Sequence, residues 1–186
     1  MASQKVTPAD MVSVESNSTS YLYFVNQKGF ISSLKSSSTD GVEAESAGFY
    51  KKESVNVTKK DSDDNEITVP VKTHADLKQI AAVAYKDPQN RYQVRLYYAE
   101  EGTLRIRELC RTDGGKWYEG ALGRTTSYKL PAGSSISANV QGAQLKVFAC
   151  SDDDVNEEGN QELSCFYAQL GSRDWARRRV TNDIKY

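Results

Sequence analysis

The sequence predicts an all-β fold built from repeated short strands. Three observations lead to this prediction: apolar and polar residues alternate with a period of two in several segments, turn residues separate these segments at short intervals, and helical periodicity is weak throughout. The chain has 186 residues, which is enough for one ordinary domain. The stretch from Val94 to Leu122 reads as two strands, a turn and the start of a third strand.

The individual strands are predicted from aromatic and β-branched residues and from alternation. Val94, Leu96 and Tyr98 fall on one face of a strand, so Arg95 and Tyr97 fall on the other. The predicted strands cover 21–25, 80–85, 94–98, 104–111, 144–149 and 163–168. Turn signals between them lie at 27–29, 87–90, 113–115 and 158–160.

These strands repeat in units of four. The clearest unit runs from Ile80 to Leu122, a second from Ser135 to Val180, and a fainter one precedes them. Even repetition of four-stranded units along a chain is typical of β-propeller blades. We therefore expect one domain over 1–186 with about three four-stranded antiparallel blades, at 10–57, 80–122 and 135–180, and a loop or insertion at 58–78.

Aligning the units shows that their polar residues differ. Between the units at 80–122 and 135–180, Arg95 corresponds to Lys146, Glu108 to Glu162, and Trp117 to Trp175. In the fainter unit that comes first in the chain, Leu22 and Ser33 take the places of Arg95 and Glu108. A lysine keeps the positive charge of arginine but lacks its planar fork. Only the unit at 80–122 is therefore expected to keep the full arginine, glutamate and tryptophan set.

Two polar runs are predicted to be exposed loops. Lys59 to Glu66 is charged and polar throughout. Asp152 to Glu158 has enough oxygen ligands for calcium, but it lacks the 12-residue pattern with a central glycine and a closing glutamate. A solvated hairpin loop is the preferred interpretation of this acidic run.

Charge and hydropathy indicate which classes of partner and location to expect. The net charge of −1 argues against a nucleic-acid surface, which needs an excess of basic residues. There is no apolar run of about 18 residues, so no membrane span is expected. The first ten residues lack the basic and apolar regions of a secretory signal. A cytoplasmic location is expected, with unconventional secretion as the alternative.

Cysteine and histidine content argues against metal and hydrolase chemistry. Cys110, Cys150 and Cys165 form no CxxC pair and are predicted to be small core residues on strands. His74 is the single histidine, so a recognisable zinc site or a histidine-based nucleophile scheme would depend on this one residue. No cofactor is expected.

The unit at 80–122 resembles a blade of the fungal fucose-specific lectins, which are six-bladed β-propellers with a sugar site between adjacent blades. The resemblance is carried by an Ile-Ala-Ala strand, an Arg-containing aromatic strand, an Ile-Arg-Glu strand and a Trp-Tyr-x-Gly strand, here at 80–83, 94–98, 106–108 and 117–120. It is weak in the third unit and marginal in the first. The resemblance implies carbohydrate binding, to fucose or a related sugar.

The resemblance also implies self-association, because this chain has room for about three blades and an open half-ring would expose two sheet faces. The simplest solution is a homodimer that closes a six-bladed ring about a two-fold axis. An irregular closure that uses elements from Gly41 to Leu77 is the alternative.

Sugar recognition explains why these residue types would occur together. A guanidinium donates to two hydroxyls at once, a carboxylate accepts from neighbouring hydroxyls, and an indole covers the apolar face of a pyranose. In the resembling lectins the tryptophan commonly comes from the neighbouring blade, so Trp175 or Trp117 could complete a pocket with Arg95 and Glu108. The candidate ligand-binding residues are Arg95, Glu108, Trp117, Trp175, Tyr97, Glu162 and Lys146.

Three other interpretations remain open from the sequence. Arg95 and Glu108 could form a plain cross-strand ion pair on a wet face. The chain could be a lectin-fold enzyme of fungal secondary metabolism that binds a hydrophobic small molecule and steers a cyclisation without a metal or a nucleophile. It could also be a scaffold whose degenerate blades only mediate association. A deep apolar cavity without an arginine–glutamate pocket would favour the enzyme.

Overall fold

The computed structural model of the chain describes residues 7–38 and 49–180, and the regular elements in these ranges are all strands. Twelve of them form three four-stranded antiparallel sheets. The first sheet contains β1 (Asp10–Ser16), β2 (Thr19–Val25), β3 (Ile31–Ser36) and β4 (Tyr50–Ser54). The second contains β7 (Ile80–Lys86), β8 (Tyr92–Ala99), β9 (Ile106–Thr112) and β10 (Tyr118–Glu119). The third contains β11 (Ser137–Gln141), β12 (Gln144–Val155), β13 (Gln161–Gln169) and β14 (Ala176–Arg179). The expected repeat of four-stranded antiparallel units is confirmed.

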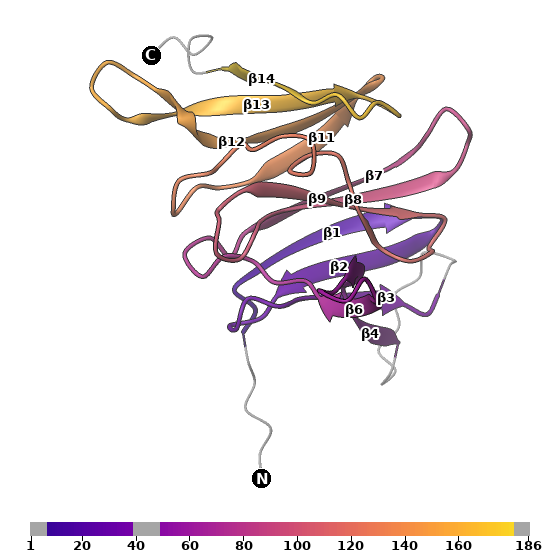
Figure 1. The fold of residues 1–186 in the computed structure, drawn as a ribbon. Coiled ribbons are helices and arrows are strands. Elements are labelled where there is room, and N and C mark those ends of the chain that lie inside the picture. The colour runs from indigo at the N-terminus through magenta and orange to yellow at the C-terminus, as the bar shows by residue number, and fades with distance from the viewer. Residues whose placement is uncertain (1–6, 39–48, 181–186) are drawn as a thin grey trace.

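The three sheets are stacked in chain order, with the second between the first and the third (Figure 1). Each sheet keeps its strands in sequence order, so the first strand lies at one edge and the fourth at the other. The first strands, β1, β7 and β11, lie next to one another across the sheets. This is the arrangement expected of successive blades in a propeller.

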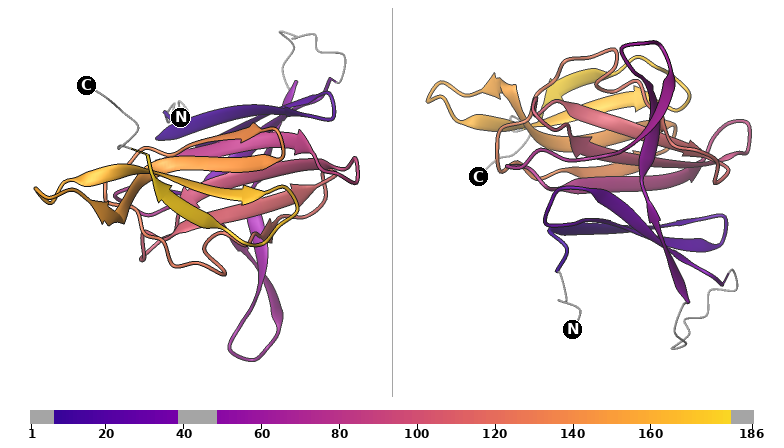
Figure 2. Two further views of the ribbon diagram at one scale, coloured as in Figure 1. Left: turned by 90° about the horizontal axis from the view of Figure 1, so that it is seen from above. Right: turned by 60° about the horizontal axis from the view of Figure 1, so that its bottom comes forward.

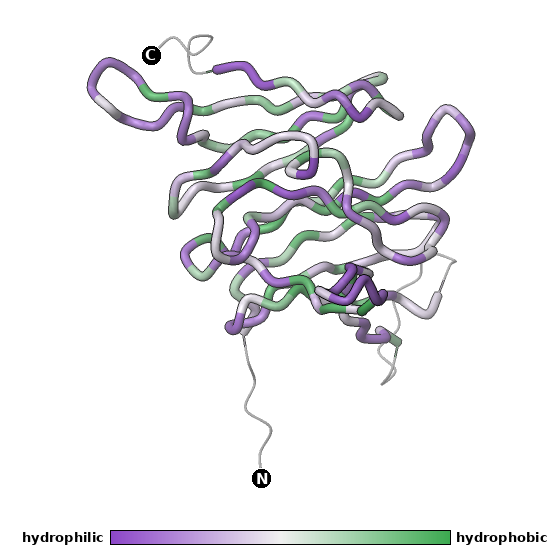
Figure 3. Tube along the Cα trace, viewed as in Figure 1, coloured by the Kyte–Doolittle hydropathy of each residue, from purple (hydrophilic) through white to green (hydrophobic). Residues whose placement is uncertain are grey.

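Two layers of apolar side chains hold the sheets together, one on each side of the second sheet. Along β8, Val94, Leu96 and Tyr98 pack toward the first sheet, whereas Tyr97 and Ala99 pack toward the third. Apolar positions alternate with polar ones along the strands, and the ends of the long hairpins are polar (Figure 3). The period-two pattern is therefore clearest in strands with one exposed face, such as β1, whereas β8, which packs against sheets on both sides, is buried almost continuously.

The segment expected as a loop or insertion at 58–78 contains a hairpin of its own. It consists of β5 (Asn56–Lys60) and β6 (Glu66–Pro70), which project away from the three sheets (Figure 2). At its base Val57 is 3% exposed and bridges to Trp117 in the second sheet. At its tip Asp61 accepts hydrogen bonds from the backbone N–H groups of Asp63 and Asn65. Residues 61–65 of the run expected as an exposed loop form the turn, whereas Lys59 and Lys60 belong to β5 and Glu66 to β6.

The acidic run at 152–158 is only in part the solvated loop that the sequence predicts. Strand β12 continues to Val155, with an irregular register after Ser151. Arg177 lies beside both Asp153 and Asp154, and Ser164 donates a hydrogen bond to Asp154. The cross-strand arginine removes the charge repulsion that would have kept the run out of a strand.

The structure also bears on metal ligands, membrane-spanning helices and the three cysteines. Within the described residues, no group of three or more histidine, cysteine, aspartate or glutamate side chains is placed to hold a metal ion. Over 7–38 and 49–180, no helix has the length and apolarity that a membrane span requires. The cysteines at 110, 150 and 165 lie on strands and are free; the first and last are buried.

Candidate functional site

Arg95 and Glu108 lie on the same face of the second sheet, on neighbouring strands. Glu108 is directly opposite Tyr97, and Arg95, two residues before Tyr97 on β8, is directly opposite Cys110. The Arg95 Nε and Glu108 Oε1 atoms are 3.8 Å apart, and the two side chains are 14% and 4% exposed. The alternation in the sequence therefore brings the two charges together as expected.

Glu108 is held in place by the backbone of the segment after β10. Its Oε2 atom accepts hydrogen bonds from the N–H groups of Ala121 and Leu122, at 3.0 and 3.4 Å, and Oε1 accepts one from the Tyr97 hydroxyl at 3.5 Å. A Cβ atom added to Gly120 would lie 2.1 Å from Oε2, so only glycine fits there. Burial raises the pKa of Glu108, although Arg95 and the two N–H donors oppose the shift.

Arg95 is oriented by two tyrosine hydroxyl groups. Its Nε donates to Tyr85 at 3.1 Å and Nη1 donates to Tyr118 at 3.4 Å, and the Cys110 thiol lies beside the guanidinium. Tyr118 is 47% exposed. Two tyrosines therefore fix the guanidinium and leave donor capacity toward solvent.

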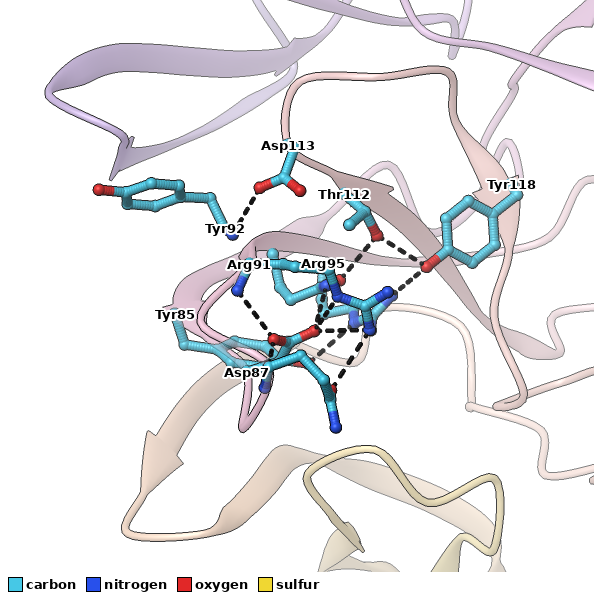
Figure 4. Close-up of polar contacts among 10 residues, drawn as sticks. Tyr85, Asp87, Arg91, Tyr92, Arg95, Thr112, Asp113 and Tyr118 are labelled. Carbon is cyan, nitrogen blue, oxygen red and sulfur yellow. Dashed lines mark hydrogen bonds and ion pairs between the residues drawn. The ribbon is translucent and has the colours of Figure 1, made fainter.

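A polar network extends this arrangement to the loop between β7 and β8 (Figure 4). The Thr112 hydroxyl lies 3.1 Å from that of Tyr118 and bonds to buried Gln93, which donates to Asp87 at 2.8 Å. Arg91 also donates to Asp87, through its backbone N–H and through Nε. Burial alone would raise the pKa of Asp87, but the donors from Arg91 and Gln93 hold it below its ordinary value.

These side chains line one cavity of about 340 Å³ between the second and third sheets. The second sheet contributes residues from all four of its strands, and the third contributes Leu145 and the loop at 171–173. The cavity lies at the small end of the range of about 300–1,000 Å³ for ligand sites, and polar side chains dominate its walls. Cys110 is part of the lining. Burial, and to a smaller extent the negative charge of Glu108, raises the pKa of its thiol to about 12, so the thiol is protonated at neutral pH.

The two tryptophans are packed between sheets. Trp175 is 8% exposed and meets Tyr97 edge-to-face, with ring centroids 6.1 Å apart. Trp117 is 9% exposed and meets Tyr23 of the first sheet in the same way, at 5.7 Å. Neither indole presents a broad exposed face. Trp175 lies on the side of Arg95 and Glu108, as the neighbouring-blade geometry predicts, and Trp117 lies at the other interface.

Two solved structures share this architecture. The fucose-specific lectin from Aleuria aurantia aligns with a TM-score of 0.59 at 17% identity, over 91% of this chain and 47% of the lectin chain. AofleA from Arthrobotrys oligospora aligns with a TM-score of 0.56 at 16% identity, over 91% of this chain and 40% of its own. This chain has the fold of part of a β-propeller lectin. At these identities the likeness concerns the fold alone.

The chain spans less than half the length of either protein. No protein-family model and no curated protein sequence matches it. The structural resemblance inferred from the 80–122 unit is confirmed, and the three sheets are blades in the sense used for those proteins.

The strand registers show which residues of the first blade replace Arg95 and Glu108. Tyr23 is opposite Ser33 in the first blade, as Tyr97 is opposite Glu108 in the second. Counting two residues back along each second strand pairs Arg95 with Tyr21. The expected match of Glu108 with Ser33 agrees with the register, but the match of Arg95 with Leu22 is wrong by one residue, which turns the side chain to the other face.

Of the two matches expected in the third blade, that of Arg95 with Lys146 agrees with the strand register, and that of Glu108 with Glu162 does not. Lys146 is opposite Tyr167, on the face away from the second blade, in the place that corresponds to Arg95. Glu162 is opposite Ser151, so it lies on the other face, and it pairs with Arg179 at 2.8 Å. Cys165 occupies the place of Glu108. Glu162 is three residues away from Cys165, and a shift by an odd number of residues moves a side chain to the other face of the sheet. Lys146 and Glu162 therefore do not share a pocket.

Sequence reasoning missed Tyr85, Tyr118 and Gly120 as parts of the site. The strand pairing connects two of them, Tyr118 and Tyr85, to Arg95. Tyr118 is opposite Cys110, which is opposite Arg95, so the three form a row across the blade. Tyr85 is one step diagonally from Arg95, since it is opposite Gln93. Tyr97, in contrast, is fully buried and supports Glu108 and Trp175 without reaching the cavity.

Proposed function

We propose that this chain binds carbohydrate, and that fucose or a related sugar occupies the cavity between the second and third blades. The observation that carries the proposal is the Arg95 guanidinium, which two tyrosines hold beside Glu108 at the wall of a small polar cavity. The Nη atoms supply the fork of donors for vicinal hydroxyls. Exposed Tyr118 supplies an aromatic surface and a hydroxyl.

Glu108 has a supporting role in this proposal. Because its Oε2 atom already accepts two backbone hydrogen bonds, Oε1 is the atom available to a sugar hydroxyl. Its charge keeps the Arg95 side chain near the cavity wall. A plain surface ion pair does not require a glycine at 120 or burial of the carboxylate, and both are present here.

The polarity of the cavity favours this function over the enzyme alternative. A site that steers the cyclisation of a hydrophobic metabolite needs a predominantly apolar enclosure. The walls around Arg95 instead carry seven charged side chains in addition to polar ones. Similarity to the protein from Aleuria aurantia supports the proposal at the level of fold, because that protein is a fucose-specific lectin.

The test compares Arg95→Lys with the unchanged chain on a fucose resin. Lysine retains the charge and loses the fork, so affinity should fall by about tenfold or more, which corresponds to about 1.4 kcal/mol. Arg179→Lys is the matched control, because Arg179 pairs with Glu162 outside the cavity. Undiminished retention of both Arg95→Lys and Arg95→Ala, with the fold intact by circular dichroism, would refute this site.

We also propose that two copies of the chain close one ring. The terminal blades present half-buried aromatic side chains on their outward faces: Phe24 in the first and Phe148 and Tyr167 in the third. The chain covers 47% and 40% of the two lectins, so a second copy supplies approximately the missing blades. A second copy is the natural occupant of both faces, because each would then meet a face like those between its own blades.

A further inference from the structure

The cavity beside Arg95 contains more positive than negative charge. Its lining includes four arginines, at 91, 95, 124 and 173, and three acids, at 87, 108 and 119. Each acid already has a basic partner: Asp87 pairs with Arg91 at 2.8 Å, Glu108 with Arg95 at 3.8 Å, and Glu119 with Lys59 at 3.3 Å. Lys59 is not part of the lining. The guanidinium groups of Arg124 and Arg173 are therefore left without a carboxylate partner in the part of the chain that the structure describes.

Arg124 and Arg173 approach the cavity from opposite walls. Arg124 belongs to the turn after β10, in which its N–H donates to the carbonyl of Ala121 at 3.0 Å. Ala121 is itself bonded to Glu108, so this turn is tied to the site. Arg173 belongs to the third blade, in the short loop before Trp175. Both side chains are exposed, and neither makes a hydrogen bond or an ion pair with any other described residue.

We infer that the ligand of this cavity is an anionic saccharide, one that carries a sulfate ester or a carboxylate in addition to its hydroxyls. This inference rests on the proposed carbohydrate function and specifies its ligand class. A guanidinium binds a sulfate or carboxylate group through parallel charge-assisted N–H···O bonds. Arg95 and the tyrosines would hold the sugar ring, and Arg124 and Arg173 would hold the anion at the rim.

Two further observations favour an anion over a neutral sugar. The whole chain has a net charge of −1, so the positive cavity is a local feature and not a consequence of a basic protein. Each of the three lining carboxylates is paired with a basic side chain, and that of Glu108 is only 4% exposed, so their repulsion of an incoming anion is reduced. The attraction between the anionic group of the ligand and the exposed side chains of Arg124 and Arg173 should weaken as salt is added, because 0.1 M salt screens exposed charges over about 10 Å.

The experiment measures the affinity of the full chain for methyl α-L-fucoside, its monosulfated form and the methyl glycoside of a uronic acid, by calorimetry at low and at 0.5 M salt. The expected result is about tenfold tighter binding of the sulfated than of the neutral sugar at low salt, with the ratio falling toward one at high salt. The uronate arm distinguishes a carboxylate from a sulfate, and inorganic sulfate tests whether the anion binds without a sugar.

The variants assign the effect to the two arginines. Arg124→Gln combined with Arg173→Gln should bring the affinity ratio of sulfated to neutral sugar close to one. Lys28→Gln combined with Lys51→Gln removes the same charge from the first blade and should leave the ratio unchanged. A ratio near one for the unchanged chain with every anion overturns this inference while leaving the proposed function intact. Failure to bind any of the sugars overturns the proposed function itself.

Discussion

Tyr97 and Trp175 meet edge-to-face across the interface between the second and third blades, with ring centroids 6.1 Å apart and planes at 76°. Tyr23 and Trp117 repeat the contact between the first and second blades, at 5.7 Å and 80°. In each case the tyrosine belongs to the second strand of one blade and the tryptophan immediately precedes the fourth strand of the next. An aromatic contact between adjacent blades therefore recurs in this fold. The polar site lies between the same two blades as the contact of Tyr97 with Trp175.

Trp175→Ala should lower the free energy of unfolding by about 3–5 kcal/mol, because it removes a large buried ring and leaves a cavity beside Tyr97. Trp117→Ala should cost a similar amount. Tyr118→Ala, at a ring that is 47% exposed, is the control and should cost less than about 1 kcal/mol. Denaturant unfolding followed by circular dichroism measures all three. Equal costs for buried and exposed rings would contradict the packing role.

The two tyrosines should respond differently to loss of their hydroxyl groups. Among the described residues the buried Tyr23 hydroxyl makes no well-aligned hydrogen bond, although the Arg111 guanidinium lies near it, so Tyr23→Phe should change the unfolding free energy by less than about 0.5 kcal/mol or stabilise the fold. Tyr97→Phe removes a donor to the Glu108 carboxylate and should cost about 1–2 kcal/mol. A larger cost at Tyr23 than at Tyr97 would show that the hydrogen-bond assignment is incorrect.

Gly120→Ala should displace the Glu108 side chain, since the new Cβ would lie 2.1 Å from Oε2. The two backbone N–H donors would then lose their acceptor, and the expected cost is about 1–3 kcal/mol. A double-mutant cycle checks the cause: in the Glu108→Ala background the same glycine substitution should cost far less. An unchanged cost in that background would place the clash elsewhere.

Glu108 should make stability depend on pH in a direction opposite to that of an ordinary ion-paired carboxylate. Burial raises its pKa in the folded state, so the folded chain takes up a proton more readily than the unfolded chain. The stability of the unchanged chain relative to Glu108→Gln should therefore rise as pH falls from 7 toward the ordinary glutamate range. Urea unfolding of both proteins measures this difference, in which the contributions of Asp61 and Asp87 cancel. A difference that shrinks on acidification would mean that the arginine outweighs burial.

Phe148→Glu should reduce the solution mass from that of two chains to that of one, because it places a charge on the outward face of the third blade. Ile67→Glu, on the projecting β5–β6 hairpin, makes the same chemical change at a 40% exposed position and should leave the mass unchanged. Light scattering coupled to size-exclusion chromatography gives both masses. A single-chain mass for the unchanged protein at micromolar concentration would exclude ring closure by a stable dimer.

The sequence by itself determined the strands, their grouping in fours and the shared face of Arg95 and Glu108, because all three follow from a period of two and from local turn chemistry. Only the tertiary structure decided the pairing registers. A shift of one residue turned Leu22 away from the place of Arg95, and Glu162 proved to lie on the face opposite Lys146. Register depends on which strands meet and on burial from both sides, and this information is not local in the chain. The same is true of Gly120, Arg124 and Arg173, whose significance depends on neighbours that folding brings together.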